Sequence, residues 1–363
     1  MPGIGVYVHI PYCRCKCRYC SFVSTVNLSS QRQYVEALKR EIAAFRCGET
    51  AETVYIGGGT PSCLYTGAIE EIMDCIGDRF TVEKTAEVTV EANPESTSTQ
   101  FFDECRRAGI NRVSIGLQCA NDDVLKKAGR LHSVRQFIDA VKTARAAGID
   151  NISADFIVGL EGETHDDVKN TLDLITALSI PHISVYSLSV EKGSIMYACA
   201  YRPDEDDMAD EYAFASDCLR SRGYERYEIS NFAKNGQIGR HNRGYWLHKP
   251  YIGFGAAAHS YIDGERFSNT ENIASYIGGL TTVYREKIDA GQLREEYVML
   301  RLRLKEGIDL NEYKSLFGSE LTDVKGGEIQ KLKTLGVIDV ADNRLFATDK
   351  GVYVLNSIIT ELI

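Results

Sequence analysis

Four cysteines lie within eight residues near the start of the chain: Cys13, Cys15, Cys17 and Cys20. Thiolates are soft ligands, and close spacing on one loop lets them converge on zinc or on an iron–sulfur cluster. Three basic residues alternate with them: Arg14, Lys16 and Arg18. Because nearby positive charge favours the thiolate form, this loop is suited to binding metal.

The spacing leaves the ligand set open. Cys13, Cys17 and Cys20 form a C-x3-C-x2-C pattern, and three ligands would leave one iron of a [4Fe–4S] cluster free. A zinc site would need a fourth ligand, for which Cys15 is the nearest candidate. A zinc knuckle, or a loop prone to disulfide formation, therefore remains an alternative to an open cluster.

Predicted strands and helices alternate along the part of the chain that must position this loop. Six apolar, strand-like runs are separated by amphipathic helical patterns: 6–10, 53–56, 86–94, 112–118, 151–159 and 182–188. Such alternation predicts an α/β fold, with a parallel sheet and helices outside it. Periodicity alone does not separate an incomplete barrel from a doubly wound open sheet.

Polar and glycine residues follow the predicted strands. The cysteines come after the first strand and Gly57–Pro61 after the second. Glu91 and Asn93 end the third strand, Gln118 the fourth and Asp155 the fifth. In parallel α/β folds ligands bind at the carboxyl ends of the strands, so we expect these residues to line one site.

The cysteine pattern, with Tyr19 before its last cysteine, resembles the radical S-adenosylmethionine (radical SAM) superfamily. The preceding run from Tyr7 to Cys13 is similar to the HemN/HemW family, which is related to oxygen-independent coproporphyrinogen III oxidase. The resemblance implies a partial (β/α)6 barrel over residues 1–200. It also implies that Cys13, Cys17 and Cys20 hold a [4Fe–4S] cluster, that S-adenosylmethionine chelates its open iron, and that Cys15 is an extra thiol.

The same resemblance places further residues at the cofactor. The residues that match family segments near S-adenosylmethionine are Tyr7, Tyr19, Gly58, Gly59, Thr60, Glu91, Gln118, Arg130 and Asp155. The family usually has proline after Leu160, where this chain has Glu161, so we expect a changed loop there without loss of function.

A later stretch bears on which branch of the family the chain resembles. Residues 239–246 resemble the H-N-x-x-Y-W signature of the haem-chaperone (HemW) branch, which implies haem binding at His241, Tyr245 and Trp246. Taken alone, a histidine beside aromatic residues is more often structural than a ligand. Coproporphyrinogen oxidases carry a further cysteine where this chain has Phe22, and the chaperone branch usually has aspartate at Ser21.

We therefore expect a haem chaperone that binds haem, a [4Fe–4S] cluster and S-adenosylmethionine and passes haem to acceptor proteins. Flavodoxin or ferredoxin is the expected electron donor. The alternative is a radical SAM enzyme that decarboxylates coproporphyrinogen III or modifies another porphyrin, and a plain iron–sulfur or zinc protein is a third hypothesis. Whether the chain is an enzyme stays open at this point.

The composition of the chain limits the binding partners and the cellular compartment that we expect. A formal net charge of −10 disfavours nucleic-acid binding, which calls for a basic surface. No apolar run approaches the length of a membrane span, and the N-terminus lacks a secretory pattern, so we expect a cytoplasmic protein. Eleven cysteines without such a pattern indicate a reducing compartment.

The alternation of strands and helices ends near residue 190. We expect an α+β extension over residues 201–283, which contains a strand pattern at 225–232 and the H-N-x-x-Y-W stretch. Helical patterns near 297–304 and 327–335 precede a hairpin pattern at 337–346 and a final helix from Asp349. Residues 284–363 are therefore predicted to form a small winged-helix-like module that caps the structure.

Overall fold

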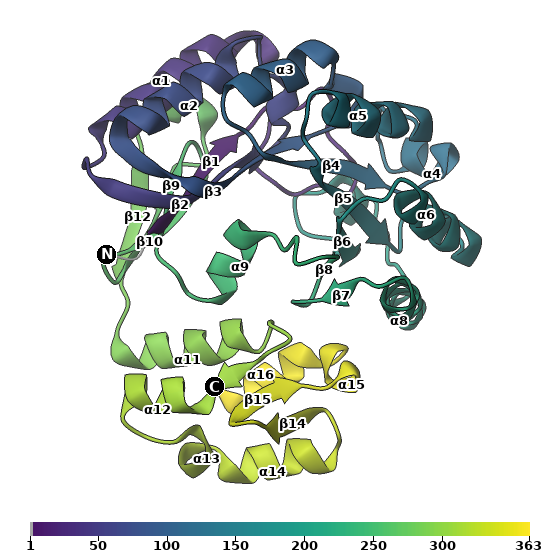
Figure 1. The fold of residues 1–363 in the computed structure, drawn as a ribbon, viewed down its shortest axis with the longest axis vertical. Helices are drawn as coiled ribbons and strands as arrows, with labels where there is room; N and C mark the ends of the chain where they lie inside the picture. The colour runs from purple at the N-terminus through teal and green to yellow at the C-terminus, as the bar shows by residue number, and fades with distance from the viewer. Residues whose placement is uncertain (1–2) are drawn as a thin grey trace.

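The computed structural model describes residues 3–363 and is built on one large sheet (Figure 1). Six parallel strands form its centre: β1 (Ile4–Ile10), β2 (Glu49–Gly58), β3 (Phe80–Ala92), β4 (Arg112–Gln118), β5 (Asn151–Val158) and β6 (His182–Ser187). They lie side by side in the order in which they occur in the chain. A doubly wound sheet reverses order beside its first strand, so this sequential order is that of the predicted partial barrel.

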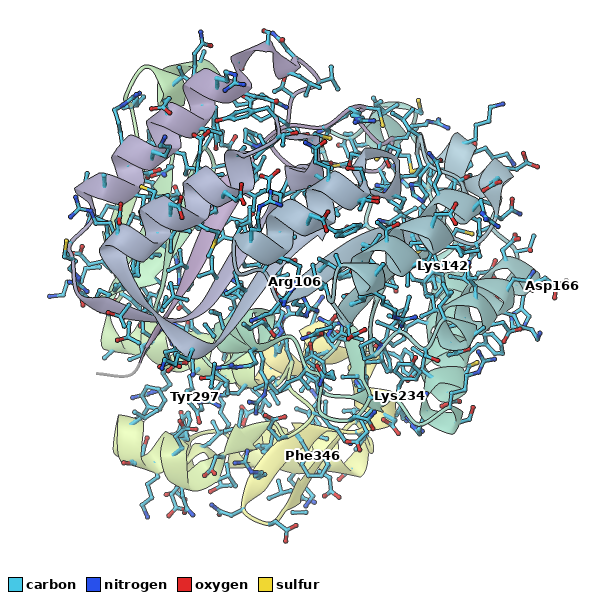
Figure 2. All side chains as sticks on the ribbon, turned by 45° about the horizontal axis from the view of Figure 1, so that its top comes forward. Arg106, Lys142, Asp166, Lys234, Tyr297 and Phe346 are labelled. Atoms are coloured by element: carbon cyan, nitrogen blue, oxygen red, sulfur yellow. The ribbon has the colours of Figure 1, made fainter. Side chains whose placement is uncertain are left out.

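Helices cover the outer face of these strands, as Figure 1 shows. They are α1 (Gln31–Ala44), α2 (Ala68–Arg79), α3 (Thr99–Arg107), α4 (Asp122–Lys127), α5 (Val134–Ala146) and α6 (His165–Ala177). Charged side chains such as Lys142 and Asp166 point outward from this layer (Figure 2). The apolar faces of the helices pack on the strands, where residues such as Leu38, Ile72 and Phe137 are fully buried.

The central strands are continued on both sides into a 12-stranded sheet. The elements after β6 are α7 (Ile195–Ala198), α8 (Glu205–Ser221), β7 (Glu225–Arg226), β8 (Asn231–Ala233), α9 (Arg240–Trp246), β9 (Tyr251–Phe254), β10 (His259–Ile262), β11 (Glu265–Asn269), α10 (Ile273–Ile277) and β12 (Thr282–Lys287). β8 pairs antiparallel with β6, whereas β9 returns to pair parallel with β1. The chain thus crosses from one edge of the partial barrel to the other through α9.

The C-terminal residues pack around a hydrophobic cluster of their own that includes Tyr297, Leu332 and Leu345. The elements are α11 (Ala290–Arg301), β13 (Ile308–Asp309), α12 (Leu310–Phe317), α13 (Leu321–Val324), α14 (Gly326–Thr334), β14 (Ile338–Ala341), β15 (Arg344–Ala347), α15 (Asp349–Val352) and α16 (Leu355–Leu362). Asp342 and Asn343 join the hairpin strands in the left-handed conformation. Tyr297 packs inside this module, where its ring contacts Tyr313 and Phe317 of α12, and Phe346 lies on the hairpin (Figure 2).

Two local expectations are corrected by the structure. Residues 225–232 read as one strand, but they form β7 and β8 with a turn between them, in which Tyr227 N–H donates to Asn231 O at 3.1 Å. The final helix is likewise divided into α15 and α16. Within residues 3–363, no helix is both long enough and apolar enough to cross a membrane.

Candidate metal and cofactor site

The cysteine loop is fixed to the carboxyl end of β1 at its base and to a neighbouring turn at its tip. Cys13 N–H donates to Thr25 O at 3.0 Å, and Thr25 N–H donates to Pro11 O at 2.7 Å. Further along, Arg18 N–H donates to Ala128 O at 2.9 Å, at the end of α4. All four thiols of the loop line one cavity of about 540 Å³. The loop therefore has a defined shape that presents its sulfur atoms to a single space.

The glycine turn after β2 approaches the cysteines closely. Gly59 N–H donates to Ile10 O at 2.8 Å, and a Cβ at Gly59 would lie 3.0 Å from Cys13 Sγ. Gly58 has φ of +110°, which side chains rarely adopt, and a Cβ there would meet the ring of His9 at 2.5 Å. The Thr60 hydroxyl donates to Cys13 Sγ at 3.4 Å. The turn thus forms a cradle that only glycine backbone allows.

Arg130 connects the cysteine loop to two strand ends. Its guanidinium donates to Cys17 Sγ at 3.7 Å, to Asn93 Oδ1 at 2.8 Å and to Gly116 O at 3.1 Å. The neighbouring Cys15 thiol and the charge of Arg130 lower the pKa of Cys17 against the effect of burial. This shift favours the thiolate, which is the form that binds metal.

Cys15 differs from the other three thiols. Its thiol lies beside Cys17 and donates to the Gly129 carbonyl oxygen at 3.2 Å. The neighbouring Cys17 and burial raise the pKa of Cys15, and burial also raises the pKa of Cys13 and Cys20. Cys15 is accordingly a hydrogen-bond donor in this arrangement.

The donor set fits an iron–sulfur cluster. All four cysteines of the loop line one cavity, and thiolates are the ligands that iron–sulfur clusters use. The loop, the glycine cradle and the thiolate at Cys17 suit such a group.

Two carboxylates lie on the strand side of the cavity. Glu91 accepts hydrogen bonds from the Tyr55 hydroxyl at 2.6 Å and from Gly58 N–H at 3.1 Å. Burial raises the pKa of Glu91 to about 7, although the Tyr55 hydrogen bond opposes this shift. Asp155 accepts from the Ser114 hydroxyl at 3.1 Å, and burial raises its pKa as well. A bound cation or hydroxyl groups would offset the cost of burying these acids.

Most residues predicted at the cofactor meet in this cavity. Besides the cysteines, its lining includes Tyr19, Gly58, Gly59, Thr60, Glu91, Gln118, Arg130 and Asp155. Asn93, which was expected there from its position after β3, also lines the cavity, where it donates to the Thr60 hydroxyl at 2.9 Å and accepts from Arg130. Sequence reasoning did not single out two further lining residues, Ser114 and Tyr186.

A second cavity of about 930 Å³ adjoins the first and is lined by many aromatic side chains. Its lining contains the other predicted residues: Tyr7, His241, Tyr245 and Trp246. The two cavities share the lining residues Ser21, Phe22, Gly58, Glu91 and Tyr186. Phe22 is 67% exposed at this shared boundary. The cysteine loop and the H-N-x-x-Y-W stretch therefore line two adjoining spaces.

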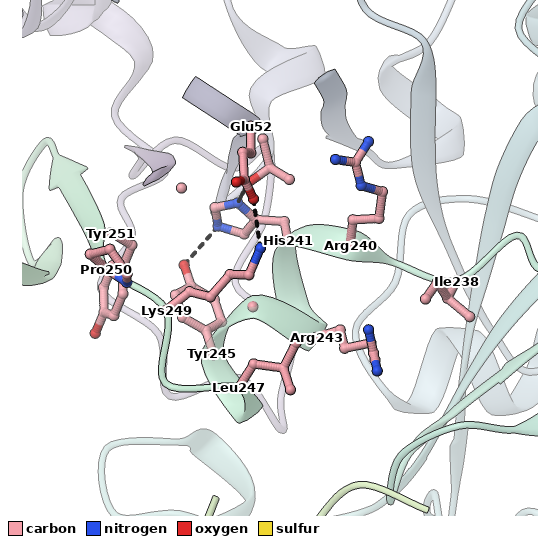
Figure 3. Close-up of a pocket in the computed structure, with 13 residues that line it drawn as sticks. Glu52, Ile238, Arg240, His241, Arg243, Tyr245, Leu247, Lys249, Pro250 and Tyr251 are labelled. Carbon is pink, nitrogen blue, oxygen red and sulfur yellow. Dashed lines mark hydrogen bonds and ion pairs between the residues drawn. The ribbon is translucent and has the colours of Figure 1, made fainter. Parts of the chain in front are cut away.

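His241 is held on both sides of its ring. One ring nitrogen is 2.8 Å from the Thr53 hydroxyl and the other is 2.8 Å from the Tyr245 hydroxyl (Figure 3). The ring stacks on Tyr55 with centroids 5.1 Å apart. Burial, with a contribution from Arg112, lowers the pKa of His241 to about 3, so the imidazole is neutral. In this arrangement His241 positions Tyr245 on the cavity wall.

Comparison with known proteins agrees with this geometry. The radical SAM superfamily model matches residues 7–175, and the HemN C-terminal domain model matches residues 288–354. Coproporphyrinogen III oxidase (HemN) from Escherichia coli has the same fold, with a TM-score of 0.88 over 99% of this chain and 90% of that one, at 21% sequence identity. The fold and the cysteine site together define a radical SAM protein, a class that carries a [4Fe–4S] cluster and S-adenosylmethionine.

Similarity to proteins of known sequence identifies the family within this superfamily. It is 33% identical to the haem chaperone HemW of Lactococcus lactis, covering 98% of this chain and 96% of that protein. It is 30% identical to the haem chaperone HemW of Escherichia coli, covering 99% of this chain and 98% of that protein. The chain belongs to the HemW family.

Proposed function

We propose that this chain is a haem chaperone, which binds haem beside a [4Fe–4S] cluster and S-adenosylmethionine and passes haem to acceptor proteins. The observation that carries the proposal is the aromatic cavity of about 930 Å³ that adjoins the cysteine cavity. Its size is within the range of small-molecule sites, and its aromatic walls suit a flat macrocycle. The relatives from Lactococcus lactis and Escherichia coli are named haem chaperones, which supports this proposal.

On the cluster side, each residue has a definite task in this proposal. Cys13, Cys17 and Cys20 hold the cluster, which supplies an electron-transfer centre with one open iron when it is bound. Arg130 keeps Cys17 ionised through its charge and its hydrogen bond. Glu91 and Asp155 offer carboxylates to the amino group and hydroxyl groups of S-adenosylmethionine.

Three more residues complete the cofactor side. The backbone of Gly58 and Gly59 leaves room for the ligand at the end of β2. Gln118 ends β4 in the left-handed conformation, with φ of 69°, and lines the same cavity. A non-glycine residue in this conformation is strained, and such strain is often retained at functional sites.

On the haem side, Tyr7, Tyr245 and Trp246 form part of the wall of the second cavity. The Tyr7 hydroxyl is 3.0 Å from Nδ1 of His9, which lines the same cavity. The indole of Trp246 is covered by the guanidinium of Arg303 from the C-terminal module, at 5.4 Å from the ring centroid. This contact connects the cavity wall to the module.

The proposed partners follow from this activity. An acceptor protein receives the haem, and an electron donor such as flavodoxin or ferredoxin reduces the cluster. Among residues 3–363, none of the eleven cysteines is in a disulfide, and reduced cysteines persist in reducing compartments. We accordingly assign the chain to the cytoplasm.

One anaerobic experiment tests the proposal. The full chain is reconstituted with iron and sulfide, haem is titrated, and the Soret band is followed. In parallel, coproporphyrinogen III is offered with S-adenosylmethionine and a reductant. We expect roughly four iron and four sulfide per chain, haem binding at one per chain, and no decarboxylated product.

The other outcomes are equally informative. Formation of protoporphyrinogen would replace the chaperone function with coproporphyrinogen oxidase activity. A colourless protein that holds zinc would exclude the cluster. A loaded cluster without haem binding would refute the chaperone function while leaving the radical SAM assignment in place.

A further inference from the structure

Four histidines line the second cavity, and three of them are already engaged. His9 has one ring nitrogen 3.0 Å from the Tyr7 hydroxyl and the other 3.0 Å from Val23 O. Both ring nitrogens of His241 are hydrogen-bonded, as described above. The His248 ring is stacked on Tyr261, and its Nε2 lies 3.2 Å from a carboxylate oxygen of Glu296 without forming a hydrogen bond.

The fourth histidine, His259, is different. Its side chain is exposed and lines the cavity, and within residues 3–363 it has no side-chain hydrogen bond or ion pair. An imidazole with a free nitrogen that faces a cavity has the chemistry of a haem-iron ligand. His9 and His241 would each have to break hydrogen bonds to bind iron, and His248 would have to leave its stack on Tyr261.

Strand pairing places His259 on the aromatic wall. Side chains two residues apart on a strand share a face, so His259 and Tyr261 point to the same side of β10. The exposed–buried alternation of β10 agrees, because Ser260 and Ile262 are buried between and after them. Tyr261 is directly opposite Tyr251 on the neighbouring strand β9, which puts both tyrosines on that face.

The loop that leads into β10 is held firmly. Glu41 of α1 accepts from Gly255 N–H at 2.9 Å and from the Asn269 amide at 2.6 Å. Ala257 has φ of 61°, and its N–H donates to Thr270 O at 2.9 Å. A strained residue that is fixed by the surrounding structure, two positions before an unpaired histidine, indicates a side chain held ready for a ligand.

We propose that His259 is the axial ligand of the haem iron in the second cavity, with Tyr251 and Tyr261 against the macrocycle. This inference rests on the proposed function and deepens it by assigning the ligand. His241 is then a positioning residue, which holds Tyr245 on the wall and does not contact the iron. The step is ligation only, in which a nitrogen lone pair of His259 forms a bond to iron and no electron is transferred.

The test uses the full chain with its cluster reconstituted, and ferric haem as the probe. Soret spectra and electron paramagnetic resonance of the ferric haem are recorded for the wild type, His259→Ala, His241→Ala and His165→Ala. His165 serves as the matched control, because it is an exposed histidine on α6 that is paired with Glu211 at 3.0 Å and does not line the cavity. Iron and sulfide content shows that each variant is folded.

We expect His259→Ala to bind haem at least about ten-fold more weakly, a loss of about 1.4 kcal/mol. We also expect it to lose the histidine-ligated spectrum, which added imidazole should restore. His241→Ala should weaken binding while keeping that spectrum, and His165→Ala should match the wild type.

A His259→Ala protein with wild-type affinity and spectrum would overturn the assignment. Loss of the ligated spectrum in His241→Ala alone would transfer the ligand role to His241. If the wild type itself bound no haem, the proposed function would fail, and this outcome is distinct from failure of the ligand assignment.

Discussion

Substitution of Gly59 by alanine tests the close approach between the glycine turn and the cysteine loop. The added Cβ would lie 2.8 Å from Ile10 O, 2.8 Å from Tyr12 O and 3.0 Å from Cys13 Sγ, whereas ordinary contact begins at 3.4 Å. Two of these atoms belong to backbone that also pairs with the turn, through Gly59 N–H and Thr60 N–H. Because backbone does not yield as a flexible side chain does, the cysteine loop must move.

The cost of this movement sets the expected size of the effect. Adding a methyl group to a well-packed region costs about 1–3 kcal/mol. If the strain falls on the binding geometry, the same energy corresponds to a loss of roughly 5–150-fold in affinity. We therefore expect Gly59→Ala to lose most of its cluster during anaerobic reconstitution, or to bind S-adenosylmethionine at least roughly five-fold more weakly.

Gly77→Ala is the matched control. Gly77 lies in α2 with nothing within 4 Å of the position of an added Cβ. Alanine in a helix is more stable than glycine by about 0.5–1 kcal/mol, so this variant should gain stability and load its cluster normally. The two single-methyl changes should thus shift the free energy of unfolding in opposite directions.

The assay combines iron and sulfide content, titration of S-adenosylmethionine, and urea unfolding of the protein without its cluster. We propose that the wild type loads about four iron atoms. The reasoning would be refuted if Gly59→Ala also loaded about four iron atoms and bound S-adenosylmethionine with wild-type affinity, and if its free energy of unfolding lay within about 0.5 kcal/mol of the wild-type value. That result would mean that the loop accommodates the methyl group freely.

Three further predictions concern other parts of the site. Cys17→Ala should abolish the brown cluster chromophore whereas Cys15→Ala should not, and equal loss in both would contradict the proposed ligands. Because the pKa of Glu91 is raised to about 7, its carboxylate forms as pH rises through that value, so binding of cationic S-adenosylmethionine should tighten between about pH 6 and about pH 8. Glu91→Gln should bind more weakly with a flat profile, and an unchanged profile would remove Glu91 from the binding role. Arg303→Ala should lower the free energy of urea unfolding by about 0.5–1 kcal/mol, because it removes the cation over Trp246, and no change would show that this contact is not stabilising.

Much of the partial barrel could be predicted from hydrophobic periodicity. The strand predicted at residues 112–118 is β4, and the strand at 151–159 is β5 with its last residue removed. Since consecutive parallel strands place their carboxyl ends at one edge, the strand-end residues Glu91, Gln118 and Asp155 could be expected to meet, and they line one cavity. Local sequence was sufficient here because each strand pairs with its neighbour in the chain.

Local pattern was insufficient where distant segments decide the outcome. Residues 225–232 alternate like a strand, but Tyr227 hydrogen-bonds to His182 at 2.8 Å and Glu228 forms a bridge with Leu304. These tertiary contacts break the run into two short strands. The parallel pairing of β9 with β1 is likewise a contact between segments more than 200 residues apart, and no periodicity signals it.

Two of the four histidines that line the second cavity, His241 and His259, show the same distinction at the level of function. His241 belongs to a recognisable motif, yet Thr53, nearly 190 residues earlier, occupies one of its ring nitrogens and Tyr245 the other. Among residues 3–363, His259 has no such partner, and it gains its place on the cavity wall from the pairing of β10 with β9. A motif identifies which segment lies at a site, but contacts made across the fold decide which ring nitrogens stay free for a ligand. Nε2 of His248 also lacks a hydrogen bond, but the His248 ring is stacked on Tyr261. His259 is therefore the exposed histidine of this cavity that can bind iron without leaving an existing contact.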